Sequence, residues 1–137
     1  MKTSIEVANL TKKKIDPDLV KKTVRKTAKL AEADLDLLEI SVVFVGEAES
    51  RKINRRYRQK NKSTDVLSFN LDSGYNKKRK TLEGELVLCP EVIAKNARAN
   101  KVEFEHEFVF VLAHGVLHVL GWRHGRKMYE LQDKISD

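Results

Sequence analysis

LAHGVLHVLGWRH, residues 112–124, places three of the chain's four histidines in its most apolar segment. His114 and His118 are four residues apart, so a helix puts both rings on one face. Gly121 follows and can adopt the positive φ that turns a chain at a helix C-terminus, which brings His124 back toward the other two. Neutral imidazoles so placed suit zinc–nitrogen bonds of ~2.0–2.1 Å. We therefore predict one divalent metal ion held by His114, His118 and His124.

Three protein ligands leave a fourth position for water, which is typical of a catalytic rather than a structural zinc site. The apolar neighbours of the histidines predict that this helix is buried and holds its ligands rigidly; they are Phe108, Val109, Val111, Leu112, Val116, Leu117, Val119 and Leu120. His106 lies among glutamates and is expected on the surface. Imidazole suits zinc, nickel and cobalt alike, so the choice of metal stays open at this point.

The same histidine spacing is the ligand skeleton of the metzincin peptidases, so a peptidase is one alternative. Zinc peptidases of the H-E-x-x-H type carry their general base directly after the first histidine. Here that position is Gly115, which has no carboxylate. The peptidase interpretation is therefore disfavoured.

Composition indicates an ordinary globular protein. The chain has 137 residues, 41% hydrophobic and 34% charged, which fits one domain spanning residues 1–137. No apolar run reaches the roughly 18–20 residues of a membrane span, and the N-terminus has no apolar signal-peptide core. The single cysteine, Cys89, excludes an intrachain disulfide and is expected to be a small buried residue at a strand end. We expect a cytoplasmic protein without membrane attachment.

Hydrophobic periodicity predicts an α+β fold with a four-stranded mixed sheet covered by about five helices and a metal site at the end of a central buried helix. Strands are expected at 3–8, 38–45, 64–71 and 84–89, the last two as antiparallel neighbours. A loop is expected at 72–84. Helices are expected at 17–34, 47–58, 90–100, 103–120 and 126–135.

The net charge of +7 attracts polyanions such as RNA. Part of this charge is concentrated in RKINRRYRQKNK, residues 51–62, where seven of twelve residues are basic. A short charged run is often only a solvated helix face. This one leads directly into an apolar strand, so it must lie close to the folded core. Within it, Tyr57 is expected to pack in the core with Ile53 rather than to stack on a base.

Three segments together resemble the YbeY family of metal-dependent endoribonucleases, also called rRNA maturation factors. HGVLHVLGWRH resembles the family's histidine signature. INRRYRQKNKSTDVLSFNLD resembles its second motif, and LEGELVLCPEVI resembles the family's L-G-[DE]-I strand. The resemblance covers most of residues 40–125.

The resemblance implies an endoribonuclease that matures the 3′ end of small-subunit ribosomal RNA and acts in ribosome quality control. It implies one zinc ion on His114, His118 and His124, and a functional arginine at Arg58. RNA, ribosomal RNA and the small ribosomal subunit are the implied partners. Arg123 stands where the family usually has aspartate, and Asn70 where proline often follows LSF. These departures leave the three histidines unchanged.

The mechanistic hypothesis is that zinc lowers the pKa of bound water to about 7, so that a hydroxide attacks the phosphodiester. Arg58 stabilises the developing charge, because a guanidinium pairs with phosphate through two hydrogen bonds. Neighbouring cations are expected to contact the RNA backbone without reading its sequence; these are Arg51, Lys52, Arg55, Arg56, Lys60 and Lys62. Ser63, Thr64, Asp65 and Glu85 are weaker candidates near the metal, since such residues more often cap or turn the chain.

A second alternative is a non-enzymatic ribosome-associated factor with a purely structural zinc ion. The open coordination position that three histidines leave argues against it. The sequence predicts neither the oligomeric state nor the cleavage site.

Overall fold

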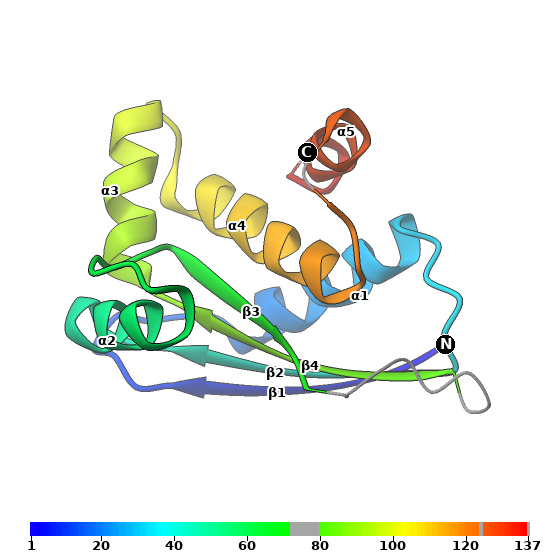
Figure 1. Ribbon diagram of the computed structural model, residues 1–137. Helices are drawn as coiled ribbons and strands as arrows, with labels where there is room; N and C mark the ends of the chain where they lie inside the picture. The colour runs from blue at the N-terminus through cyan, green and yellow to red at the C-terminus, as the bar shows by residue number, and fades with distance from the viewer. Residues whose placement is uncertain (72–79, 124, 137) are drawn as a thin grey trace.

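The computed structural model describes residues 1–71, 80–123 and 125–136. Its strands and helices alternate as far as the third strand, a fourth strand follows directly, and three successive helices end the chain (Figure 1). The strands are β1 (Lys2–Asn9), β2 (Leu37–Phe44), β3 (Val66–Asn70) and β4 (Thr81–Leu88). The helices are α1 (Pro17–Leu30), α2 (Glu47–Arg58), α3 (Pro90–Asn100), α4 (Phe104–Val119) and α5 (Arg126–Ser136).

The four strands form one mixed sheet in the order β1-β2-β4-β3. β1 and β4 both run parallel to β2, while β3 pairs antiparallel with β4. The parallel pairs need helical crossovers, and α1 provides the connection from β1 to β2. The predicted α+β fold with a four-stranded mixed sheet and antiparallel β3–β4 pairing is confirmed.

One face of the sheet carries most of the core. Alternate residues of β2, namely Leu38, Ile40, Val42 and Phe44, are at most 2% exposed and pack with the helices. The opposite face is covered only in part, where Ile53 of α2 packs against a small cluster formed by Val45, Leu67 and Val87. α2 therefore lies over the second face of the sheet, near the start of β3.

The long helix α4 lies centrally over the main face, in contact with α1, α3, α5 and β3 (Figure 1). Six of the eight apolar residues predicted to bury this helix are buried, with Leu112, Val116 and Leu117 fully inaccessible, whereas Val109 and Leu120 are only partly buried. Two glycines allow its close approach to the sheet. A Cβ on Gly84 of β4 would collide with Val119, and a Cβ on Gly115 would lie 3.0 Å from Leu86 and 3.1 Å from Val66.

Some predicted element boundaries are wrong. The first helix ends at Leu30 rather than 34, because Glu32 adopts φ +52° and its N–H and that of Ala33 close the helix on Lys29 and Ala28. β4 begins at Thr81, inside the predicted loop, where Leu82 faces the core and pairs with Leu38. The remainder of that loop, residues 72–79, lies outside the described residues.

Cys89 is fully buried at the end of β4, as predicted, and burial raises the pKa of its thiol. His106 is exposed in the first turn of α4, also as predicted. Among the described residues, none of the helices combines the length and apolarity that crossing a bilayer requires.

Candidate metal centre

His114 and His118 converge on the face of α4 that points toward β3. Their Nε2 atoms are 2.9 Å apart, and their rings lie 4.4 Å centre to centre at 75° to one another. Two nitrogens bound tetrahedrally to one zinc ion lie roughly 3.3–3.4 Å apart. The observed nitrogen pair therefore needs only a small outward movement to hold a common ion.

The end of α4 forms the sharp turn that the sequence predicted. Gly121 adopts φ +91°, its N–H bonds to the His118 carbonyl at 3.0 Å, and the Trp122 N–H bonds to the Leu117 carbonyl at 2.9 Å. This pair of bonds is a Schellman motif, which reverses the chain after a helix. The third predicted ligand, His124, lies outside the described residues, three positions beyond this glycine.

The environment of the two histidines fits a cation. His118 is in the last turn of α4, where the negative end of the helix dipole favours positive charge. Both rings are partly buried, so solvent screens such a charge only in part. Within the described ranges no group of three potential metal ligands gathers.

The two rings line a cleft of about 770 Å³ that also contains Arg58. Arg58 is the last residue of α2, so the sequence-distant histidine and arginine motifs meet at one hollow. The rest of the lining comes from α2, the segment before β3 and β3 itself: Tyr57, Thr64, Asp65, Val66, Leu67, Ser68 and Phe69.

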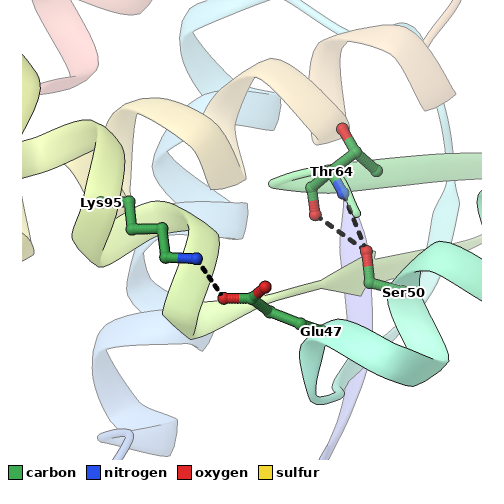
Figure 2. Close-up of polar contacts among 4 residues, drawn as sticks. All are labelled: Glu47, Ser50, Thr64 and Lys95. Atoms are coloured by element: carbon green, nitrogen blue, oxygen red, sulfur yellow. Dashed lines mark hydrogen bonds and ion pairs between the residues drawn. The ribbon is translucent and has the colours of Figure 1, made fainter. Parts of the chain in front are cut away.

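Two small polar side chains of α2 hold the segment between α2 and β3 in place. The Ser50 hydroxyl donates to the Thr64 carbonyl at 3.1 Å and accepts from the Thr64 N–H at 2.9 Å (Figure 2). One turn later, Asn54 Nδ2 donates to the Lys62 carbonyl at 2.9 Å. Ser50 and Asn54 are 2% and 1% exposed, and neither stood out in the sequence.

The N-terminal end of α2 is tied to α3. Lys95 Nζ donates to Glu47 Oε1 at 2.7 Å, and this hydrogen bond raises the pKa of Lys95 (Figure 2). Together with the Ser50 and Asn54 contacts, this ion pair positions the helix whose last turn presents Arg58 to the cleft.

The predicted RNA-contacting cations lie around α2 but do not line this cleft with Arg58: Lys52 and Arg56 line a second hollow, and Arg51 and Lys62 line a third. Arg55 and Arg56 are exposed in the last turn of α2, and Lys60 and Lys62 are exposed in the segment that follows. Tyr57 departs from its prediction, since it is 55% exposed and contacts Phe69 edge to face at 5.2 Å. Ile53 fills the space over the sheet, and Tyr57, one turn on, lies at its margin.

The four residues that the sequence offered as weaker candidates near the metal lie in different places. Thr64 and Asp65 line the cleft, but Asp65 Oδ1 accepts from the Val66 N–H at 2.8 Å and so caps the start of β3. Ser63 and Glu85 line other hollows. Ser68, which the sequence did not single out, donates its hydroxyl to the Gly115 carbonyl at 3.2 Å and fixes α4 on β3.

Comparison with known proteins shows which family the chain belongs to. The sequence model described as endoribonuclease YbeY matches residues 6–137. The chain belongs to the YbeY family. It is 36% identical to the endoribonuclease YbeY of Buchnera aphidicola over 94% of this chain and 77% of that protein. It is 35% identical to the endoribonuclease YbeY of Chlorobium luteolum over 94% of this chain and 93% of that protein.

The fold of this YbeY-family chain also resembles a solved structure. The solution structure of a Thermotoga maritima protein matches with a TM-score of 0.64 and 27% identity, covering 96% of this chain and 86% of that one. Membership in a family of endoribonucleases supports a hydrolase that acts on RNA, and it disfavours the peptidase alternative.

Packing explains why this YbeY-family chain has glycine where a zinc peptidase has glutamate. A Cβ at Gly115 would lie 3.0–3.3 Å from Leu86, Val66 and Ser68 of the sheet. A glutamate there would be buried between α4 and β3. The position therefore serves close packing of the ligand-bearing helix.

We predict that Gly115→Glu lowers stability and produces no peptidase activity. Overpacking costs about 1–3 kcal/mol, and burial of a carboxylate adds to this cost. Denaturant unfolding measures the loss, and a casein assay tests the activity. The matched control is Gly125→Glu, because among the described residues, its chain neighbours aside, an added Cβ there meets no atom closer than 3.9 Å. Equal stability of the two variants would contradict the packing explanation.

Proposed function

We propose that this chain is a zinc-dependent endoribonuclease that cleaves single-stranded RNA in the cytoplasm. Its proposed substrate is small-subunit ribosomal RNA at the 3′ end, with a further role in ribosome quality control. The observation that carries the proposal is the meeting of His114, His118 and Arg58 at one cleft. The family's activity and the names of the curated relatives support the RNA substrate.

His114 and His118, with His124, would hold the zinc ion. When bound, zinc acts as a Lewis acid and brings the pKa of water close to neutrality. The chain's own part is to orient the imidazoles. The buried face of α4 fixes the backbone of both residues, and the Schellman turn at Gly121 directs the chain toward position 124. Nickel or cobalt would substitute in vitro, because imidazole binds each of them.

Arg58 would bind the scissile phosphate. It is exposed at the mouth of the cleft, where its guanidinium has room to pair with two phosphate oxygens. These bonds orient the phosphodiester toward the histidines and offset negative charge as it develops. Arg55, Arg56, Lys60 and Lys62 would follow the RNA backbone on either side.

The cleavage assay uses a single-stranded RNA labelled at each end. Two fragments, one with each label, are expected from an internal cut, and a matched duplex is expected to remain intact. Casein is incubated in parallel. Release of peptides, or shortening of the RNA only from an end, would contradict the proposal.

We predict that neutralising four cations lowers the salt dependence of RNA binding. Binding to single strands weakens with a slope of about −0.7 per phosphate contact in a plot of log affinity against log salt. The combined variant of Arg55, Arg56, Lys60 and Lys62 to glutamine is expected to lose about 2–3 units of slope. The control changes exposed cations elsewhere, on α1 and at the end of α3: Lys22, Lys29, Arg98 and Lys101. Equal slopes for both variants would locate the RNA elsewhere.

A further inference from the structure

A second hollow lies beside the candidate metal cleft, between α2 and the sparsely covered face of the sheet. Its volume is about 460 Å³, within the range of about 300–1,000 Å³ typical of small-ligand sites. Tyr57 and Phe69 line both hollows, so the two adjoin at this aromatic pair. Arg58 directly follows Tyr57 in the chain, so a nucleotide next to a phosphate bound at Arg58 is within reach of the second hollow.

The shared wall has the character of a stacking surface. Tyr57 is 55% exposed, and the guanidinium carbon of Arg56 lies 5.4 Å from its ring centre. Its edge-to-face contact with Phe69 holds the ring without burying it. An exposed aromatic ring between cations is the usual arrangement by which proteins stack a base while they hold the adjoining phosphates.

The rest of the second hollow suits the edge and face of a nucleobase. Phe69 and Leu71 give it apolar surface, and Leu71 is itself 50% exposed. Lys52 and Arg56 bring positive charge to its α2 side. Glu85 of β4 brings a carboxylate, which accepts hydrogen bonds from the amino or ring N–H groups of a base.

We propose that this hollow is a nucleobase subsite. Tyr57 is the ring on which the base of the nucleotide next to the scissile phosphate stacks, and Glu85 accepts from the edge of that base. The inference rests on the proposed function, because it takes Arg58 as the residue that binds the scissile phosphate. It adds a specificity element to a surface that otherwise contacts only the backbone.

The test uses single-stranded RNAs in which one abasic ribonucleotide is moved stepwise across the cleavage site. For the unmodified protein, KM is expected to rise about 10- to 100-fold when the abasic nucleotide occupies the subsite. Tyr57→Ala is expected to raise KM similarly on intact RNA and to show no further abasic penalty. Tyr57→Phe keeps the ring and is expected to retain the abasic penalty, which Tyr57→Ala loses. An equal abasic penalty in Tyr57→Ala would overturn the proposal.

Two further measurements separate the subsite from the proposed function. Fluorescence anisotropy of the same RNAs reports binding independently of cleavage. Failure to cleave any RNA, with an abasic-sensitive affinity that depends on Tyr57, would reject the nuclease and keep the subsite. Cleavage with a flat abasic scan would reject the subsite alone. Glu85→Gln is expected to change the ranking of the four bases at the sensitive position, and an unchanged ranking would remove Glu85 from the site.

Discussion

Replacing His118 by alanine is expected to abolish zinc uptake and RNA cleavage while leaving the fold of the protein intact. His118 provides one of the two Nε2 atoms that meet at 2.9 Å, and no other described side chain replaces it there. Loss of a residue that merely supports a metal ligand already costs about 10–100-fold in activity. Loss of a ligand itself is therefore expected to cost more than about a hundredfold. His114→Ala is expected to have the same effect.

The same variants give a second readout in thermal stability. A ligand that binds only the folded protein stabilises it by about 3–4 kcal/mol at 100 to 1,000 times its Kd. For a chain of this length such a gain raises Tm by roughly 10 °C. This rise in Tm on zinc addition is expected for the unmodified protein. It is not expected for His114→Ala or His118→Ala.

His106→Ala is the matched control for both histidine variants. It removes an exposed imidazole from the first turn of the same helix, far from the convergent pair. Its zinc content, Tm gain and cleavage rate are expected to equal those of the unmodified protein. Stoichiometric zinc in His114→Ala or His118→Ala would refute the ligand assignment.

Replacing Arg58 by alanine is the second change with a large expected effect. Its guanidinium lines the cleft with the two histidines and carries no packing role, since it is exposed at the end of α2. Removing one group that stabilises developing negative charge typically costs about 10²–10³ in kcat. Zinc content and Tm are expected to stay unchanged, because the metal ligands and the core are untouched.

Arg58→Lys distinguishes charge from geometry. Lysine keeps the positive charge but lacks the planar fork that pairs with two phosphate oxygens, so an intermediate kcat is expected. Arg98→Ala removes an equivalent exposed charge from the last turn of α3 and serves as the control. If Arg58→Ala and Arg98→Ala have the same kcat, Arg58 contributes only to the general charge of the surface.

The histidine pair was predictable because helical periodicity alone determines which side chains share a face. The turn at Gly121 was predictable for a similar reason, since glycine marks the left-handed residue that ends many helices. The end of α1 was not predictable in this way, because the left-handed residue there is Glu32 rather than a glycine. The start of β4 was not predictable either, because the residues around it are polar and charged, a composition typical of loops.

Placement of α2 against the cleft depends on contacts that local patterns do not reveal. Ser50 and Asn54 look like polar residues of an exposed helix, yet both are buried because they satisfy backbone groups of the following segment. Tyr57 repeats the spacing of Ile53 and is still exposed, because it lies against Phe69 of β3, the edge strand of the sheet. Only tertiary structure distinguishes these cases.

The most direct test of the account is cleavage of a defined single-stranded RNA by the purified protein before chelation, after chelation and after restoration of zinc. We expect one zinc ion per chain, loss of cleavage on chelation, and recovery with a single equivalent of zinc. RNA cleavage that persists undiminished in the metal-depleted protein would contradict the account.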